Sequence, residues 1–279
     1  MLSPAARAER FKALHERPGT FVIPNPWDVG SAKMLQRLAF EALATTSAGF
    51  AFSLGKPDGE GAVDRAEALR HVRAIVDATD LPVSADLENG FGDDPDTCAE
   101  TIRLASEAGL AGGSIEDASG GRADPIYAFD LAVQRIRAAV RAARGMPHPF
   151  TLTARAENFL HGRLDLPDTI RRLQAFADAG ADVLYAPGLS AREDIAAVVR
   201  AVAPKPVNVL AGSSLSVEDL AALGVKRVSV GGALARSAYG AFLRAAREIR
   251  ETGTFTFAEQ AVPFGEINGM FRTDRQASE

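Results

Sequence analysis

Short apolar segments alternate with longer amphipathic segments along the whole chain. The stretch from Pro82 to Leu87 has the composition of a short buried strand, whereas apolar residues recur between Val63 and Ala78 at the i, i+3, i+4, i+7 spacing of a helix. Strand-like segments, each followed by a helix or by a helix and a loop, occupy residues 21–28, 42–47, 82–87, 111–117, 151–157, 181–188, 206–212 and 227–232. This alternation predicts a parallel sheet.

The number of repeated units favours a closed barrel. Eight βα units within about 250 residues fit a (β/α)8 barrel of the TIM type better than an open doubly wound sheet. No strand is followed by G-x-G-x-x-G at a helix start, so a dinucleotide-binding fold is disfavoured. The composition does not change along the chain, so residues 1–279 are predicted to form one barrel domain with residues 254–279 as a C-terminal helical extension.

The C-terminal extension is unusually apolar for a segment that follows a complete barrel. Its apolar residues are Phe255, Phe257, Val262, Phe264, Ile267, Met270 and Phe271. Such a surface needs a place to pack. We therefore expect the extension to pack on a partner subunit, or to be exchanged with one, in a homodimer or homotetramer.

Charge and composition exclude several classes of protein. A formal net charge of -5 provides no basic surface for nucleic acid or for an anionic membrane. No signal-peptide core and no apolar run of about 20 residues is present, and the single cysteine, Cys98, cannot form an internal disulfide, so a cytoplasmic protein is expected. The dispersed histidines disfavour a zinc site. No lysine falls inside a predicted strand, which disfavours Schiff-base chemistry.

Charged and polar residues gather at the ends of the predicted strands, where a barrel of this type places its active site. Asp86 and Glu88, two residues apart, are expected to point to the same side of a strand. Two carboxylates this close are costly unless a cation or a shared proton offsets them, and Mg²⁺ prefers oxygen ligands. Taken alone, the pair fits equally well a turn with solvated acids. Further residues at these ends, Asn25, Asp28, Glu116, Asp117, Arg155, Glu157, Tyr185 and Asn208, favour a charged site.

Seven segments at these positions, in order, resemble the phosphoenolpyruvate mutase/isocitrate lyase superfamily over nearly the whole chain. They are Pro24 to Ala32, Thr46 to Gly49, Leu54 to Gly59, Ala85 to Gly92, Ser114 to Asp117, Thr153 to Glu157, and Pro206 to Val209. The resemblance implies that Asp86, Glu88 and Glu116 hold Mg²⁺, with Mn²⁺ as an alternative. The family usually has an aspartate where this chain has Glu88.

The same resemblance implies roles for the remaining site residues. Arg155 clamps the substrate carboxylate, supported by Glu157 and Asn208, and Asp58 matches a conserved acid in the loop after the second strand. The backbone amides around Ser47, Ala48 and Gly49 bind the keto acid end of the substrate. Trp27 and Asp28, in the first of the matching segments, are assigned to the substrate-binding set as well.

One segment departs from the family pattern. Lyases of this superfamily carry a Lys-Lys-Cys-Gly-His-type loop after the strand with Glu116, and the mutases carry an Asn there on a long loop. Here the segment from Glu116 to Pro125 is shorter and has neither. Cys98 lies inside the preceding predicted helix and is expected to be buried and inert. His161 is then the candidate acid, with a surface-loop histidine as the alternative interpretation.

The implied function is a Mg²⁺-dependent lyase that cleaves a C–C bond of a small α-keto or α-hydroxy carboxylate through an enolate. Oxaloacetate decarboxylase and 2-methylisocitrate lyase are examples of such enzymes. One alternative is a mutase or hydrolase that acts on the P–C bond of phosphonopyruvate-type substrates. An alternative of another class is a non-catalytic ligand-binding barrel. Apart from a small carboxylate and further copies of the chain, no binding partner is expected.

Overall fold

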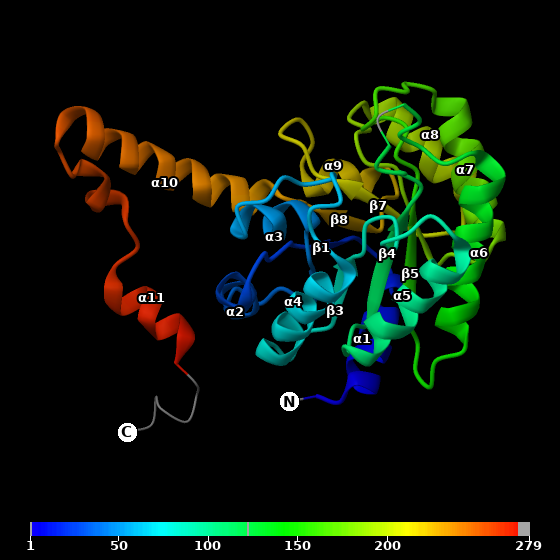
Figure 1. Ribbon diagram of the computed structural model, residues 1–279, viewed down its shortest axis with the longest axis horizontal. Coiled ribbons are helices and arrows are strands. Elements are labelled where there is room, and N and C mark those ends of the chain that lie inside the picture. The colour runs from blue at the N-terminus through cyan, green and yellow to red at the C-terminus, as the bar shows by residue number, and fades with distance from the viewer. Residues whose placement is uncertain (1, 122, 273–279) are drawn as a thin grey trace.

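The computed structural model describes residues 2–121 and 123–272, in which eight parallel strands form one sheet (Figure 1). The strands are β1 (Phe21–Ile23), β2 (Leu43–Ala44), β3 (Val83–Asp86), β4 (Gly112–Glu116), β5 (Thr151–Arg155), β6 (Val183–Tyr185), β7 (Val207–Leu210) and β8 (Arg227–Ser229). Their spatial order is β1-β8-β7-β6-β5-β4-β3-β2. The barrel closes between β1 and β2, where the Ala44 N–H donates to the Pro24 carbonyl (3.0 Å). The predicted (β/α)8 barrel is confirmed.

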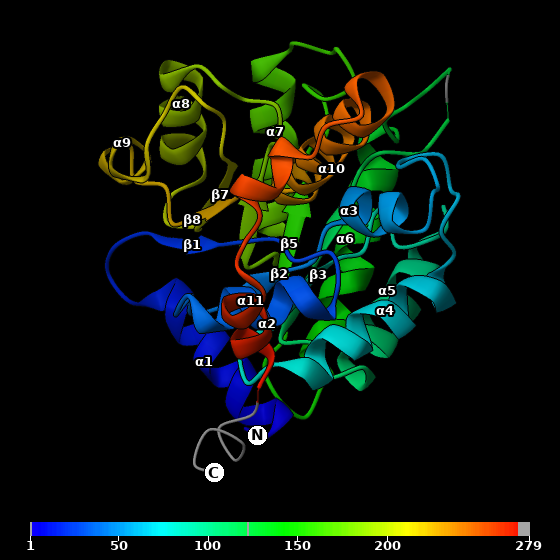
Figure 2. The same ribbon diagram turned by 90° about the vertical axis from the view of Figure 1, so that its left-hand side faces the viewer.

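Helices connect successive strands and cover the sheet, and α1 precedes them (Figure 2). They are α1 (Pro4–Glu16), α2 (Val29–Arg37), α3 (Ser47–Ser53), α4 (Arg65–Ala78), α5 (Pro95–Glu107), α6 (Phe129–Arg144), α7 (Leu166–Asp178), α8 (Arg192–Val202) and α9 (Val217–Ala222). Asp94 and Ser216 are the N-caps of α5 and α9, because each side chain accepts a hydrogen bond from the backbone N–H three residues later. No helix among the described residues is long and apolar enough to span a bilayer.

The second strand is shorter than predicted. We expected a strand from residue 42 to 47 followed by a loop, but Ser47 begins α3. The Thr46 hydroxyl accepts a hydrogen bond from the Gly49 N–H (3.3 Å), which stabilises the first turn of this helix. The capping interaction ends the strand and turns Ser47 and Ala48 toward the mouth of the barrel.

The interior of the barrel is polar and lined by small side chains. Along β5, Leu152 and Ala154 pack outward against the helices, whereas Thr153 and Arg155 point inward and bond to polar groups of other strands. Barrels of this type usually fill the interior with branched apolar residues. Here Ser84, Ser114 and Ser229 leave room instead, so a cavity extends from the mouth into the barrel.

The elements after β8 leave the barrel. They are α10 (Ala233–Thr252), η1 (Thr256–Gln260) and α11 (Phe264–Phe271). Figure 1 shows α10 pointing away from the sheet, and in it only Ala235 is buried. The chain then returns toward α2, where the Arg37 guanidinium donates to the Arg272 carbonyl (2.7 Å). Residues 273–279 of the predicted extension lie outside the described residues.

His15 joins α1 to the base of the barrel. Its Nδ1–H donates to the Phe11 carbonyl (2.8 Å), and its Nε2 accepts from the Arg227 guanidinium (3.3 Å). Because Arg227 can only donate, the ring is assigned as the neutral tautomer protonated on Nδ1. Burial, together with the charges of Arg227 and Lys226, lowers the pKa of His15 to about 3, and the hydrogen bond to Phe11 opposes this shift only in part.

We expect this histidine to make the fold sensitive to acid. Between its ordinary pKa of 6.5 and its folded-state value of about 3, the unfolded chain binds a proton that the folded chain does not. Stability therefore falls as the pH falls through this range. Carboxylates titrate in the same range, so the measurement is the thermal midpoint of the wild type compared with His15→Gln from about pH 7 to about pH 4. The wild type should lose more stability than the variant. Equal losses would exclude His15 as the titrating group.

Candidate active site

A cavity of about 330 Å³ opens at the C-terminal ends of the strands. Six of the residues predicted for the site line it, namely Ser47, Ala48, Asp58, Asp86, Arg155 and Asn208. They come from different βα units far apart in the sequence. The structure therefore brings together the core of the predicted set at the end of the barrel where this fold places catalytic residues.

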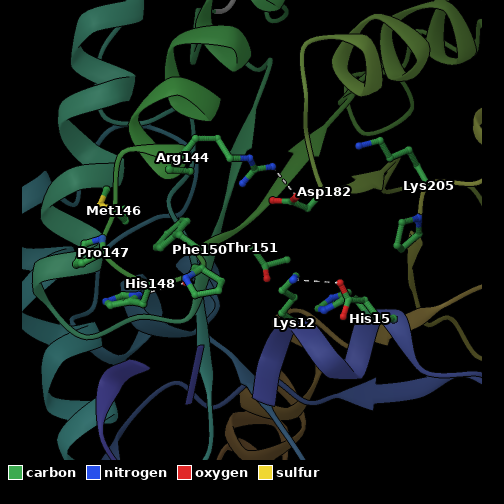
Figure 3. A pocket seen from close by; sticks show the side chains of 14 residues that line it. Lys12, His15, Arg144, Met146, Pro147, His148, Phe150, Thr151, Asp182 and Lys205 are labelled. Carbon is green, nitrogen blue, oxygen red and sulfur yellow. Dashed lines mark hydrogen bonds and ion pairs between the residues drawn. The ribbon is translucent and has the colours of Figure 1, made fainter. Parts of the chain in front are cut away.

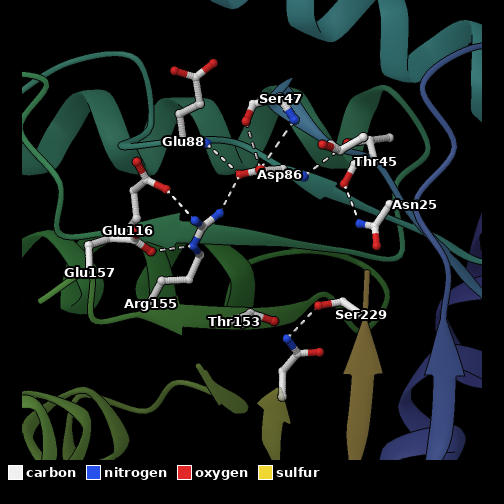
Figure 4. A network of polar contacts seen from close by, with 12 residues as sticks. Asn25, Thr45, Ser47, Asp86, Glu88, Glu116, Thr153, Arg155, Glu157 and Ser229 are labelled. Carbon is white, nitrogen blue, oxygen red and sulfur yellow. Dashed lines mark hydrogen bonds and ion pairs between the residues drawn. The ribbon is translucent and has the colours of Figure 1, made fainter. Parts of the chain in front are cut away.

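Arg155, at the end of β5, is the centre of the polar network at the mouth (Figure 4). Its guanidinium contacts three carboxylates: Asp86 at 2.9 Å, Glu116 at 3.1 Å and Glu157 at 2.8 Å. The Arg155 side chain is only 12% exposed and that of Glu157 only 3%. Burial lowers the pKa of Arg155, but the three carboxylates outweigh this effect and raise it well above its ordinary value. Arg155 is a permanent cation held in one orientation.

Asp86 links this network to the start of α3. Its Oδ2 accepts from the Ser47 hydroxyl (3.1 Å) and from the Ser47 N–H (3.4 Å), and its own N–H donates to the Thr45 hydroxyl (3.1 Å). The Gly49 N–H is used by the Thr46 cap. Of the three backbone amides predicted to bind substrate, only that of Ala48 has no acceptor among the described residues and lies on the cavity wall.

The Glu88 N–H donates to Asp86 Oδ1 (3.3 Å), but the Glu88 side chain does not continue the alternation of β3, so the prediction that the two side chains point to the same side of a strand was wrong. The strand ends at Asp86, and a turn follows in which the Gly90 N–H donates to the Leu87 carbonyl (2.8 Å). Glu88 has a φ of +48°, so the alternation of side chains along the strand does not extend to it. In Figure 4 its carboxylate points away from the Arg155 network. Arg135 holds the turn from below through the carbonyls of Asn89 and Gly92.

Negative charge accumulates at the mouth and shifts the proton affinity of its acids. Burial, with the charges of Asp86 and Asp58, raises the pKa of Glu88 to about 7, although Arg155 opposes the shift. Burial and Asp86 also raise the pKa of Asp58, against the effect of the Ser47 hydroxyl and Arg155. Burial raises the pKa of Glu116 well above its ordinary value even though Arg155 lowers it. One arginine does not neutralise this group of acids.

Carboxylates of this kind are suitable ligands for a divalent cation. In the structure, however, they are arranged around the guanidinium of Arg155. Within the described parts of the chain, no three His, Cys, Asp or Glu side chains stand close enough together to hold a metal ion. Arg155 lies between Asp86 and Glu116, and Glu88 is turned outward. Carboxylate oxygens with raised proton affinity are the donors that Mg²⁺ prefers. Holding Mg²⁺ by Asp86, Glu88 and Glu116 is thus consistent with the donor set and requires these side chains to rearrange.

Seven predicted residues do not line the cavity: Glu88, Glu116 and Glu157, described above, together with Trp27, Asp28, Gly49 and His161. The Asp28 carboxylate caps α2 and accepts from the Ser31 N–H (2.6 Å). Trp27 and Gly49 pack against each other, since a Cβ at Gly49 would lie 2.7 Å from the Trp27 Cβ. His161 is exposed in the turn after Glu157 and is absent from the cavity wall. These placements favour structural roles for Asp28, Trp27 and Gly49 and the surface-loop interpretation for His161.

Among the further residues that line the cavity are four polar ones, of which only Tyr185 was noted in the sequence, as a residue at a strand end without an assigned role. Tyr185 ends β6, Arg227 and Ser229 lie on β8, and Arg236 lies in the first turn of α10. The position of Tyr185 at a strand end was a usable signal. Arg227 gave none, because it begins a strand, where a basic residue normally faces solvent.

Cys98 is buried in α5 as predicted. A Cβ at Gly90 would lie 2.9 Å from its sulfur, so the thiol packs directly beneath the turn that carries Glu88. Burial raises the pKa of Cys98 to about 11, which keeps it a neutral thiol.

A larger cleft, of about 680 Å³, lies at the opposite end of the barrel (Figure 3). Its basic residues are engaged by the protein: Lys12 pairs with Glu16, Arg144 with Asp182, and Lys205 donates to the Ala181 carbonyl. In this fold that end of the barrel serves stability rather than catalysis. The smaller cavity at the mouth is therefore the candidate active site.

Comparison with known proteins places the chain in a family. Residues 11–250 match the family model described as phosphoenolpyruvate phosphomutase. The chain belongs to the phosphoenolpyruvate mutase/isocitrate lyase superfamily. It is 34% identical over 258 residues to an uncharacterized protein of Mycobacterium tuberculosis, with 92% of this chain and 94% of that protein covered.

Two solved structures show how closely the fold agrees. A crystal structure of a protein from Burkholderia cenocepacia, described as a lyase/mutase, is 64% identical, covers 97% of each chain and gives a TM-score of 0.94. Oxaloacetate acetylhydrolase in complex with its product oxalate is 29% identical, covers 96% of this chain and 95% of that chain, and gives a TM-score of 0.85.

Carbon–carbon lyases are among the relatives within the superfamily. Oxaloacetate decarboxylase of Paraburkholderia xenovorans is 30% identical over 236 residues, which cover 82% of this chain and 76% of that enzyme. The 2-methylisocitrate lyase of Salmonella typhimurium is 32% identical over 185 residues, which cover 63% of this chain and 61% of that enzyme.

Removing the central guanidinium should destabilise the fold. In Arg155→Met three carboxylates lose their shared partner, and we expect the free energy of unfolding to fall by about 3 kcal/mol at neutral pH. The loss should shrink on acidification, because protonated carboxyls need no cation. Urea unfolding at two pH values measures both effects, with Arg155→Lys as the control that keeps the charge. An Arg155→Met protein as stable as the wild type would show that the network contributes nothing to folding.

Proposed function

We propose that this protein is a carbon–carbon lyase that acts on a small α-keto or α-hydroxy carboxylate and passes through an enolate. The observation that supports this most strongly is the mouth cavity, in which an immobilised guanidinium, the Ala48 amide and the carboxyl groups of Asp58 and Asp86 face one space, with the pKa of Asp58 raised by burial and by Asp86. Hydrogen-bond donors on one side and proton acceptors on the other are what enolate chemistry requires.

The residues of the cavity divide into two groups by what they can do. Arg155 and the Ala48 N–H donate to the substrate carboxylate and to the oxygen on which negative charge develops. Arg155 is held by Asp86, Glu116 and Glu157, and Glu157, which is not a proposed metal ligand, keeps the guanidinium oriented when Asp86 and Glu116 turn toward a metal ion. Asp58, which lines the same cavity and whose pKa is raised by burial and by Asp86, is the acid–base residue, because His161 does not line the cavity.

The bond changes balance without any further reagent. With an α-hydroxy substrate, Asp58 accepts the hydroxyl proton, the adjacent C–C bond breaks, and the hydroxyl carbon becomes the keto carbon of one product. The bonding electron pair stays on the other fragment as an enolate-like anion, which then takes up a proton. With an α-keto dicarboxylate, CO2 leaves, and the enolate of the remaining keto acid takes its proton from solvent.

We also propose that the enzyme requires Mg²⁺, or Mn²⁺ in its place. Bound by Asp86, Glu88 and Glu116, it would supply positive charge that polarises the substrate oxygens and offsets the acids of the mouth. Direct binding of Mg²⁺ to the wild type and to Asp86→Asn, measured by calorimetry without substrate, tests the ligand set independently of activity.

A panel of substrates tests the reaction. We expect turnover of an oxaloacetate-like or malate-like acid that depends on Mg²⁺, and Mg²⁺-dependent binding of oxalate, which mimics an enolate. In Asp58→Asn the rate should fall by about 10²-fold or more, while oxalate binding persists, because only the proton acceptor is lost. No turnover of any acid together with no oxalate binding would refute the proposal.

The same assay separates the two alternatives. Phosphonopyruvate converted in place of the carboxylates would favour P–C chemistry, which the description of the matching family model supports. A non-catalytic barrel would be indicated if Asp86→Ala changed neither any activity nor any ligand affinity.

We also propose that α10 and the elements after it form an arm that packs on a second copy of the chain. An isolated helix gains too little from its own hydrogen bonds to be stable in water, yet α10 is exposed along its length. Phe242 is 66% and Phe264 82% exposed. Among the described elements α10 packs mainly on η1, and α11 packs on α2 of the same chain. Each barrel therefore lacks a helix on its outside after β8, and its own α10 extends away from it. If two copies exchange their arms, the α10 of each copy covers the barrel of the other.

Charges placed on the arm should separate the copies. We expect the wild type to sediment as a dimer or larger, and the double variant Phe242→Asp with Leu243→Asp to sediment as a monomer. Glu251→Ala, an exposed polar change on the same helix, is the control and should leave the assembly intact. A monomeric wild type in analytical ultracentrifugation at micromolar concentration would contradict the proposal.

A further inference from the structure

A buried cation without a carboxylate partner lies at the base of the active-site cavity. Arg227 is 5% exposed, and none of the described carboxylates forms an ion pair with it. It donates instead to Asn208 Oδ1 (2.8 Å), to the Thr153 hydroxyl (2.9 Å) and to His15 Nε2 (3.3 Å). A buried charge held only by neutral groups is costly, which makes a functional role the natural hypothesis.

Arg227 fixes the direction of a chain of hydrogen bonds. A guanidinium has no acceptor, so the group of Asn208 that faces it must be the carbonyl oxygen. The Asn208 amide then donates to the Ser229 hydroxyl oxygen (2.9 Å), the bond drawn in the lower part of Figure 4. Ser229 lines the same cavity as Tyr185, and its hydroxyl lowers the pKa of Tyr185, as a hydroxyl that donates to the phenol oxygen does. The donors from Arg227 through Asn208 therefore point toward Ser229, the neighbour of Tyr185.

The chain leaves the Tyr185 hydroxyl hydrogen free to face the cavity. The phenol oxygen can accept from Ser229 while its own hydrogen is given to a second group, and the hydrogen bonds within the described parts of the chain assign that hydrogen to no other acceptor. Tyr185 lines the cavity at the end of β6, and the Arg155 guanidinium lies 5.3 Å from the centre of its ring. The hydrogen is thus available beside the cation that is proposed to bind substrate.

We propose that Tyr185 donates a hydrogen bond to the developing oxyanion of the substrate, and that Arg227 is a positioning residue that orients this donor through Asn208 and Ser229. This rests on the proposed lyase function and assigns a role to Tyr185, which the sequence places at a strand end without one. No proton needs to leave the phenol. Burial, with Glu157, raises the pKa of Tyr185 to about 12 although Arg155 and Ser229 lower it, so the donor persists at neutral and moderately alkaline pH.

Oxalate affinity and turnover of Tyr185→Phe test the donor directly. The substitution removes one oxygen and keeps the ring, so the thermal midpoint should stay close to that of the wild type. We expect oxalate to bind about 10-fold more weakly and kcat to fall by about 10²-fold with little change in KM, because the bond strengthens as charge develops. Unchanged kcat and oxalate affinity in a folded Tyr185→Phe protein would overturn the proposal.

A double-mutant cycle tests whether Arg227 acts through Tyr185. Arg227→Met lets the Asn208 amide flip, so kcat should fall, whereas Arg227→Lys keeps a donor-only cation and should restore much of it. In a Tyr185→Phe background Arg227→Met should have little further effect on kcat. Additive losses would contradict a positioning role. If Arg227→Met does not fold, Ser229→Ala breaks the same chain and should give the same non-additivity.

The two proposals fail in different ways. A wild type that neither turns over any acid of the panel nor binds oxalate refutes the lyase function and with it the role of Tyr185. A wild type that does both, with Tyr185→Phe indistinguishable from it, refutes only the role of Tyr185.

Discussion

The site depends on the guanidinium of Arg155 and the three carboxylates that hold it. Asp86, Glu116 and Glu157 come from three successive βα units, so the ion pairs fix the ends of β3, β4 and β5 relative to one another. Removing one partner would leave charge in a place that water reaches poorly. The same contacts hold the cation rigid for substrate. The arrangement of these four side chains that stabilises the fold is therefore also the one that orients Arg155 for substrate.

Much of the fold was predictable because it depends on patterns that repeat. Eight alternations of strand and helix identify the barrel, and strand ends then locate Asp86, Glu116, Arg155 and Asn208 without any knowledge of distances. The local hydrogen bonds that decide where a strand ends and a helix or turn begins were not predictable in the same way. Thr46 caps a helix where a strand was expected, and the turn after Asp86 rotates Glu88 away from its neighbour. Both outcomes depend on hydrogen bonds that no periodicity reveals.

The interior of the barrel shows a second limit of sequence reasoning. Arg227 begins a strand and resembles a solvent-facing residue, yet the small side chains of Ser84, Ser114 and Ser229 leave it room inside. The guanidinium of Arg227 donates hydrogen bonds and cannot accept one. Because Arg227 can only donate, it fixes the orientation of the Asn208 amide, and this amide in turn donates to the Ser229 hydroxyl oxygen at the cavity floor. This arrangement exists only once β5, β6, β7 and β8 are assembled.

The central claim is that the mouth cavity binds an enolate-bearing carboxylate. A crystal structure of the protein with Mg²⁺ and oxalate tests it most directly. The account predicts oxalate in the mouth cavity, within hydrogen-bond distance of Arg155 and the Ala48 N–H, with Mg²⁺ on the side of Asp86. Oxalate found only in the cleft at the opposite end of the barrel, or absent at saturating concentration from a mouth cavity that Mg²⁺ occupies, would contradict it.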